Sequence, residues 1–342
     1  MDIHQLASVA QQLVAPAKGI LAADESGPTI QKRFDSIGVD STEDSRRDYR
    51  EMLFRTDGAS DYISGVILYD ETLRQKAADG TPLVDVLRDQ GIIPGIKVDN
   101  STRPLAGAPG ELITEGLDGL RDRLAEYFKL GARFAKWRAV ITIGEGIPSD
   151  RCISANAHAL ARYAALCQEA GLVPMVEPEV LIDGDHDIAK CFEVTEATLR
   201  ETYVQLAAQL VVLEGTLLKP SMVLSGKSAA NRADSAEVGE RSIECYMATV
   251  PAAVPGLVFL SGGQGDEEAT ENLNAINRQG AKVGAPWELS FSFGRGLQAA
   301  PLIAWGGDAA NIDSAKDAFA ARARASSMAR QGKYASGAVV AG

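Results

Sequence analysis

Eight short apolar runs, separated by longer amphipathic stretches, recur along the chain. Their starts are spaced by about 30–43 residues, which fits a strand followed by a helix, repeated eight times. We expect strands at residues 20–24, 63–69, 92–98, 134–140, 173–180, 214–219, 257–262 and 287–293. This pattern predicts an α/β fold, the closed TIM (β/α)8 barrel. A doubly wound open sheet has the same alternation and is the alternative.

Helical spacing fills the intervals between the runs. One apolar face with 4-3-4 spacing is formed by Leu199, Tyr203, Leu206 and Leu210. Thr195 is the expected N-cap of that helix. An additional N-terminal helix is expected at residues 4–14. No linker divides residues 1–342, so we expect one barrel domain with a mobile C-terminal tail from about residue 332.

Composition and charge narrow the class of protein. Hydrophobic residues make up 46% and charged residues 23% of the 342 residues, so the chain can bury a large core. The net charge of −12 opposes binding to nucleic acid or to anionic membranes. No apolar run reaches the roughly 18 residues of a membrane span, and the N-terminus lacks a signal sequence. The four cysteines form no C-x-x-C pair, which indicates reduced thiols and a cytoplasmic protein.

The barrel prediction also places the chemistry, because barrel enzymes carry their active sites at the C-terminal ends of the strands. Charged residues occur at most of these ends: Asp24, Lys97, Lys136, Arg138, Glu177, Glu179, Lys219 and Arg295. Residues two apart in a strand face the same side, so Lys136 projects with Arg138 and Glu177 with Glu179. Charges that converge on a barrel mouth are costly unless they pair, and here both signs are present.

Lys219 ends an apolar run, where burial disfavours an ammonium and favours a nucleophilic amine. A second ammonium on Lys136, at ~6 Å and an effective dielectric near ~20, would add a repulsion of roughly 3 kcal/mol. The two lysines together favour imine chemistry on a ketone. The alternative is two independent rim lysines, each paired with a carboxylate.

The carboxylates admit two interpretations. Glu177 and Glu179 suit a general acid–base and a partner that positions a lysine, or two members of a structural ion-pair network. Asp24 ends an apolar strand and suits a catalytic base, although an ordinary turn cap has the same pattern.

Glycine-bearing turns follow the last two expected strands. They contain Ser261, Gly262 and Gly263 in the first turn and Ser292, Gly294 and Arg295 in the second. Glycines let backbone N–H groups approach an anion, and barrels often bind phosphate after strands seven and eight. Arg295 can add charge-assisted hydrogen bonds. The two turns together predict a phosphate site.

A metal site is not expected. The crowded group Asp183, Asp185, His186 and Asp187 lacks the spacing of a metal-binding motif and is interpreted as a solvated loop. The chain has only three histidines, so a histidine-rich metal centre is also excluded.

From about Gly19 to Tyr334 the chain resembles the class I (Schiff-base) fructose-bisphosphate aldolases. The matching stretches are Gly19-Ile-Leu-Ala-Ala-Asp-Glu-Ser26, Gly95-Ile-Lys-Val-Asp99, Phe134-Ala-Lys-Trp-Arg138, Val176-Glu-Pro-Glu179, Glu214-Gly-Thr-Leu-Leu-Lys-Pro220, Leu260-Ser-Gly-Gly-Gln264, Leu273-Asn-Ala-Ile-Asn277, Ala304-Trp-Gly-Gly307 and Gly332-Lys-Tyr334. So many matches in the same order make the resemblance specific.

The resemblance implies reversible cleavage of fructose 1,6-bisphosphate to dihydroxyacetone phosphate and glyceraldehyde 3-phosphate, in glycolysis and gluconeogenesis, without a metal or other cofactor. Lys219 would form the imine, and Glu177 would dehydrate the carbinolamine. Lys136 would assist and keep the amine neutral, with Glu179 oriented toward it. Asp24 would position Lys219 and take part in proton transfer.

The resemblance also implies the substrate contacts. The family's C1-phosphate cradle matches Ser261, Gly262, Gly263, Ser292, Gly294 and Arg295, and the positions around the rest of the substrate and the second phosphate match Ser26, Arg33, Lys97 and Arg138. Members of the family are usually homotetramers, so the expected partners are sugar phosphates and further copies of the chain.

Two departures from the animal enzymes affect these expectations. Gly27-Pro-Thr29 stands where they have Thr-Gly-Ser, next to the second phosphate site. The last tyrosine is Tyr334, whereas the animal enzymes end in a tyrosine that helps to move the proton at C3. Two other functions stay open: a lysine-imine aldolase for a different phosphorylated sugar, and a scaffold without turnover. The scaffold is disfavoured because no matched catalytic position is substituted.

Overall fold

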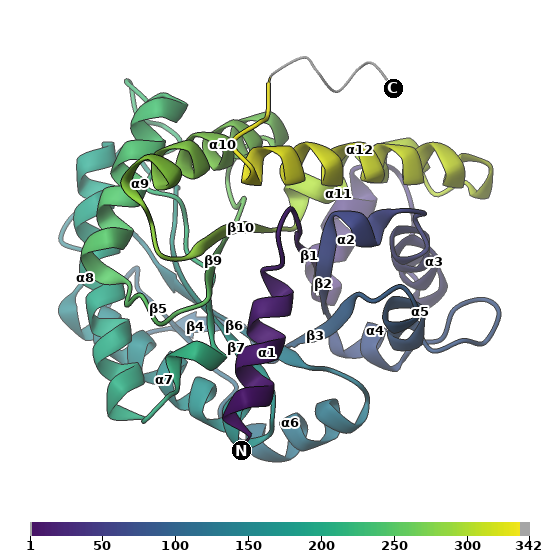
Figure 1. The fold of residues 1–342 in the computed structure, drawn as a ribbon, viewed down its shortest axis with the longest axis horizontal. Helices are drawn as coiled ribbons and strands as arrows, with labels where there is room; N and C mark the ends of the chain where they lie inside the picture. The colour runs from purple at the N-terminus through teal and green to yellow at the C-terminus, as the bar shows by residue number, and fades with distance from the viewer. Residues whose placement is uncertain (1, 336–342) are drawn as a thin grey trace.

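The computed structural model describes residues 2–335 (Figure 1). Eight parallel strands close a barrel in the order β1-β10-β9-β8-β7-β6-β3-β2. They are β1 (Gly19–Ala23), β2 (Ile63–Leu68), β3 (Ile93–Lys97), β6 (Phe134–Ile141), β7 (Val173–Val180), β8 (Leu217–Leu218), β9 (Gly256–Phe259) and β10 (Glu288–Phe293). The predicted (β/α)8 barrel is confirmed. The open sheet is wrong because β1 pairs with both β2 and β10.

Helices surround the barrel. They are α1 (Ile3–Leu13), α2 (Gly27–Asp35), α3 (Glu43–Phe54), α4 (Asp70–Arg74), α5 (Leu83–Asp89), α6 (Leu120–Lys129), α7 (Asp150–Glu169), α8 (Ile188–Ala208), α9 (Ser235–Thr249), α10 (Asp266–Val283), α11 (Arg295–Trp305) and α12 (Ile312–Arg330). Short 3-10 turns are η1 (Ala59–Asp61), η2 (Leu213–Gly215) and η3 (Ala309–Asn311). A small antiparallel sheet of β4 (Thr102–Pro104) and β5 (Leu112–Thr114) lies outside the barrel. Within residues 2–335, we find no helix with the length and apolar character of a membrane span.

The N-terminal end of the barrel is closed by α1, which lies in front of the strands in Figure 1. Leu6, Ala10 and Leu13 of α1 form one buried cluster with inward-facing residues such as Phe134 and Leu217. Apolar side chains therefore seal this end, and polar groups that face inward gather at the other end.

The side chains of β6 alternate between the inside and the outside of the barrel, and those that face inward run from the apolar core to the polar end. Phe134 faces the barrel interior, whereas Trp137 faces outward and stacks on Tyr163 of α7 with ring centroids 5.6 Å apart. Because alternate residues share a face, Lys136 and Arg138 follow Phe134 toward the interior.

One expected strand is much shorter than predicted. Residues 214–219 were expected as a strand, but η2 occupies its start and only Leu217–Leu218 forms β8. Pro220 has no N–H to continue the ladder. Lys219 still follows the strand direction, since its N–H donates to the carbonyl of Val176 at 2.8 Å.

The start and end expected for α8 are wrong. Thr195 lies inside the helix, which begins at Ile188 because the side chain of Asp187 accepts the N–H of Lys190. An aspartate cap further upstream therefore determines the boundary. Leu210 lies beyond the last turn, with a positive φ of 56° and an exposed fraction of 85%.

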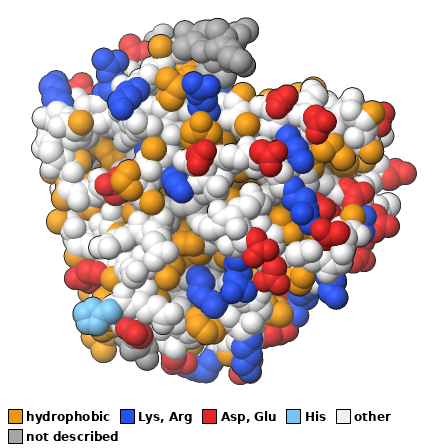
Figure 2. Space-filling view, turned by 45° about the vertical axis from the view of Figure 1, so that its right-hand side comes forward, with side chains coloured by type: hydrophobic (Ala, Val, Ile, Leu, Met, Phe, Trp, Pro, Cys, Tyr) orange, Lys and Arg blue, Asp and Glu red, His pale blue; other side chains and the backbone are white. Residues whose placement is uncertain are grey.

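The predicted mobile tail falls mainly on residues 336–342, which lie outside the described residues. Tyr334 precedes them and is buried, and mobility from residue 332 stays a prediction. Its N–H donates to Asn274 at 3.0 Å and its hydroxyl to Glu267. On the outside, acidic and basic side chains are interspersed over the face in Figure 2, so the negative net charge does not gather there.

Candidate active site

A cavity of about 610 Å³ opens at the C-terminal ends of the barrel strands. All the predicted site residues except Gly263 line it: Asp24, Ser26, Arg33, Lys97, Lys136, Arg138, Glu177, Glu179, Lys219, Ser261, Gly262, Ser292, Gly294 and Arg295. Gly263 shapes the turn behind Gly262. Its φ is +78°, and a Cβ there would lie 2.0 Å from Ile182 Cγ2.

The parallel register brings the charged residues together. Lys97 of β3 lies beside Lys136 of β6, and Arg138 lies beside Glu177 of β7. A parallel ladder thus sets a lysine next to a lysine and an arginine next to a glutamate. The side chains must then find counter-charges across the mouth.

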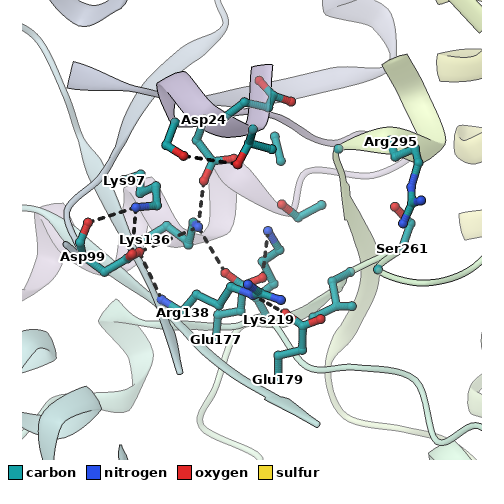
Figure 3. A pocket seen from close by; sticks show the side chains of 18 of the residues that line it. Asp24, Lys97, Asp99, Lys136, Arg138, Glu177, Glu179, Lys219, Ser261 and Arg295 are labelled. Carbon is teal, nitrogen blue, oxygen red and sulfur yellow. Dashed lines mark hydrogen bonds and ion pairs between the residues drawn. The ribbon is translucent and has the colours of Figure 1, made fainter. Parts of the chain in front are cut away.

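Those counter-charges form a chain of ion pairs at the centre of the cavity (Figure 3). Lys136 Nζ lies 2.7 Å from Asp24 Oδ2 and 3.4 Å from Glu177 Oε2. The other oxygen of Glu177, Oε1, lies 3.3 Å from Lys219 Nζ. One carboxylate is therefore shared by two lysines, and all three side chains are nearly excluded from water.

Burial and charge act in opposite directions on two of these groups. Burial by itself would raise the pKa of Asp24, but Lys136 and Lys219 together hold that pKa well below its usual range. Burial would lower the pKa of Lys136, but Asp24 and Glu177 raise it well above its usual range. Asp24 is therefore a carboxylate and Lys136 an ammonium at neutral pH.

Two expected partnerships are corrected by the structure. Glu179 pairs with Arg138, and not with a lysine. Asp24 pairs with Lys136, while the carboxylate next to Lys219 is that of Glu177. Burial would lower the pKa of Arg138, but Glu179 raises it, so this pair stays charged at the rim of the cavity.

Asp99 is a site residue that the sequence reasoning missed. Its Oδ1 lies 2.7 Å from Lys97 Nζ, and its Oδ2 lies 4.0 Å from Lys136 Nζ. The signal was present, because Asp99 follows Lys97 at the two-residue spacing that was used for the other strand ends.

The two glycine turns build a cradle suited to an anion. Gly294 precedes α11, so the positive end of this helix dipole faces the cavity. A Cβ at Gly262 would lie 2.9 Å from Glu179 Oε1, so any larger residue there would displace the Glu179 side chain. The Oγ of Ser292 is buried in the cavity wall without a hydrogen-bond partner among residues 2–335. Arg295 is exposed and lines the cavity, so its guanidinium can reach an anion there.

The segment Gly27-Pro-Thr29 forms the first turn of α2 at a second side of the cavity. Pro28 suits this position because its fixed φ matches a helix start. Ser26 and Thr29 place their hydroxyls 3.2 Å apart on the cavity wall. Arg33 of the same helix also lines the cavity and pairs with Glu25, a second residue that the sequence reasoning missed.

The crowded acidic loop is solvated at its three aspartates, as predicted, but both ring nitrogens of His186 are buried. Asp183 and Asp185 are exposed, and Asp187 caps α8. No group of three or more His, Cys, Asp or Glu residues in the described part of the chain is placed to hold a metal ion.

A closed parallel barrel whose C-terminal mouth holds two lysines on one buried carboxylate is the architecture of an enzyme that acts on carbonyl compounds through a lysine amine. The anion cradle beside these residues suits a substrate that carries a phosphate group. Comparison with known proteins narrows this class. The chain belongs to the family of class I fructose-bisphosphate aldolases, whose model matches residues 5–341.

Individual relatives agree with the family. A probable fructose-bisphosphate aldolase class 1 of Xanthomonas campestris is 59% identical over 98% of this chain and 99% of its own length. The cytosolic fructose-bisphosphate aldolase 4 of Arabidopsis thaliana is 54% identical over 97% of this chain and 84% of its own. The aldolase of Plasmodium falciparum, solved with TRAP and a small-molecule inhibitor, superimposes with a TM-score of 0.96 and 48% identity, over 98% of this chain and 96% of that one.

The function expected from the sequence is thereby confirmed. The chain is a lyase that cleaves fructose 1,6-bisphosphate in glycolysis, by the metal-independent Schiff-base route of its family. The family therefore favours fructose 1,6-bisphosphate over the two alternatives, a lysine-imine aldolase for a different phosphorylated sugar and a scaffold without turnover.

Proposed function

We propose that Lys219 is the residue that forms the Schiff base with the C2 ketone of fructose 1,6-bisphosphate. The observation that carries the assignment is the position of Glu177, with one carboxylate oxygen 3.3 Å from Lys219 Nζ and the other 3.4 Å from Lys136 Nζ. Lys136 lies within 4.0 Å of three carboxylates, those of Asp24, Asp99 and Glu177, whereas Glu177 is the one carboxylate paired with Lys219 among the described residues.

In the first half of the reaction, the amine of Lys219 attacks C2 and a carbinolamine forms. Glu177 accepts a proton from the nitrogen and returns one to the C2 hydroxyl, which leaves as water. The result is an iminium ion on Lys219. Lys136 stays charged throughout, because Asp24 and Glu177 raise its pKa, and it holds Glu177 in place.

In the second half, the iminium accepts the electrons of the C3–C4 bond. Asp24, held as a carboxylate by the lysines, accepts the proton of the C4 hydroxyl as that bond breaks. Glyceraldehyde 3-phosphate leaves, and an enamine stays on Lys219. Protonation at C3 and hydrolysis of the imine then release dihydroxyacetone phosphate.

The phosphates extend the substrate to opposite sides of these groups. The cradle formed by Ser261, Gly262, Ser292, Gly294 and Arg295 suits the C1 phosphate, with Gly263 shaping its turn. Ser26, Arg33, Lys97 and Arg138 line the rest of the cavity and suit the remaining hydroxyls and the second phosphate. Glu179 fixes Arg138 in that role.

Replacing the amine by a charged group of another kind tests the assignment. Lys219→Arg keeps a cation but cannot form an imine, so we expect kcat for cleavage to fall by at least about a thousandfold. The matched control is Lys227→Arg, at an exposed position outside the cavity, and it should retain normal kcat. Cleavage by Lys219→Arg at a near-normal rate would contradict the proposal.

We further propose that residues 1–342 fold as one domain, that four copies assemble, and that the enzyme works in the cytoplasm. The assembly of four copies is the usual state of the family. The cytoplasmic location is supported by plant relatives that are named cytosolic. Light scattering after gel filtration should give about four times the chain mass of 36.2 kDa, with one cooperative unfolding transition. A particle of the mass of one chain would contradict the assembly.

A further inference from the structure

Arg33 is held at the cavity wall by a buried polar network that spans three elements. We propose that Gln298 and Glu25 are positioning residues, which fix the guanidinium of Arg33 where it meets a phosphate of the substrate. This inference rests on the proposed function, in which Arg33 is a substrate contact.

The contacts form a short chain from β1 to the cavity. Arg33 Nη1 lies 2.6 Å from Glu25 Oε1. Gln298 of α11 donates its amide to the same Glu25 oxygen at 2.7 Å, and to the carbonyl of Ala22 at 2.6 Å. The amide of Gln298 thus ties Glu25 to the end of β1.

The free end of Arg33 faces the cavity, which Arg33 lines. Arg33 Nη2 lies close to the start of α11, since a Cβ built on Gly294 would be 3.7 Å from it. The side chain of Arg33 is 23% exposed, whereas that of Glu25 is only 5% exposed. The carboxylate therefore lies behind the guanidinium, and the guanidinium faces the substrate.

Glu25 is also fixed from the side of α3. Arg50 Nη2 donates to the backbone carbonyl of Glu25 at 3.0 Å and lies 3.9 Å from its Oε2. Arg50 Nη1 lies 3.4 Å from Glu71. With an arginine on one side and a glutamine on the other, Glu25 has little freedom to leave Arg33.

This buried polar network lowers the stability of the fold. Glu25 Oε2, Arg50 Nε and Gln298 Oε1 are buried without a hydrogen-bond partner within residues 2–335. Buried polar atoms that lack partners destabilise a fold, and apolar side chains of similar volume often serve stability better. A positional role explains why polar groups stand here. A guanidinium that is already fixed loses little freedom when it binds a phosphate, so the affinity is higher.

The test is a double-mutant cycle on KM. We expect Gln298→Met and Glu25→Gln each to raise KM for fructose 1,6-bisphosphate about tenfold, with kcat changed by less than about threefold. Arg33→Met should raise KM at least as much. In the Arg33→Met background, either second substitution should change KM by less than about twofold, because the group being positioned is gone.

The matched control is Gln168→Met, at a buried glutamine whose amide donates to Val212 and Gly215 outside the cavity. It should lower the unfolding temperature and leave KM unchanged. If Gln298→Met does not fold, Glu25→Gln carries the test, since it keeps the shape of the side chain.

Effects on KM that multiply in the double variants would overturn the inference, and so would an unchanged KM in the folded single variants. These results would leave the contact between Arg33 and substrate intact. An unchanged KM in Arg33→Met would overturn both the inference and that contact, while the assignment of Lys219 would stand.

Discussion

Lys136 and Asp24 are both largely shielded from water, and each keeps its charge because of the other. The ammonium is only 4% and the carboxylate 14% exposed, and their atoms are 2.7 Å apart. Breaking such a pair leaves a buried charge without its partner, which typically costs about 3–5 kcal/mol. The same pairing keeps Asp24 ionised and Lys136 a cation.

This coupling predicts a pH dependence of stability. The pKa of Asp24 is lower in the folded chain than its ordinary value of 3.8. A lowered folded pKa contributes stability that is complete above the unfolded pKa and is lost as the pH falls toward the folded one. Asp24→Asn should therefore destabilise the fold by about 3 kcal/mol at pH 7, measured by urea unfolding.

The difference from the unchanged chain should stay constant from about pH 8 to pH 5.5 and shrink as the pH is lowered further. Asp44→Asn, at a side chain that is 80% exposed, serves as the control and should cost less than about 1 kcal/mol at every pH. A difference for Asp24→Asn that grows on acidification would contradict the charge state assigned here.

At the residue scale, the sequence was sufficient to bring Lys219, Lys136, Glu177 and Asp24 to one end of the barrel, because the ends of strands and the side to which residues point can both be read from a pattern. It was not sufficient to assign their partners. The pairing of Glu179 with Arg138 depends on side-chain conformations across two strands, which no spacing specifies.

At the scale of elements, the turn between β9 and α10 decides the shape of the anion cradle. Gly263 has the positive φ that the turn requires and no space for a Cβ, whereas Gly265 begins α10 with nothing within 4 Å of the Cβ position. The two glycines, two residues apart, therefore differ in what they tolerate.

Gly263→Ala should lower the unfolding free energy by about 1–3 kcal/mol and raise KM several-fold, because strain in the turn displaces Ser261 and Gly262. Gly265→Ala is the matched control and should cost less than about 1 kcal/mol with KM unchanged. Urea unfolding and steady-state kinetics measure both. Equal effects of the two substitutions would show that the turn does not shape the cradle.

Elements were predictable where one signal dominated. Residues 173–180 form β7 as expected: an apolar start, Val173-Pro-Met-Val176, follows a turn, and the two glutamates after it alternate with Pro178 and Val180. The prediction failed where two signals competed. Asp187 and Thr195 can both cap a helix. Asp187 caps α8, and the longer helix that starts there includes Thr195 in its interior.

At the scale of the whole molecule, α1 seals one end of the barrel and the ion pairs occupy the other. Eight regular repeats favoured the barrel over the open sheet, and the pairing of β1 with both β2 and β10 closes it. The network behind Arg33 could not be predicted, because the bond from Gln298 to Ala22 joins residues 276 positions apart. Only the closed fold brings α11 next to β1.

The account rests on covalent chemistry at one lysine, and reductive trapping measures it directly. The protein is incubated with dihydroxyacetone phosphate, reduced with sodium borohydride, digested, and mapped by mass spectrometry. We predict one adduct per chain, on the peptide that contains Lys219, and loss of activity in proportion to labelling. An adduct on Lys136 or Lys97 instead, or activity that survives complete labelling, would contradict the account.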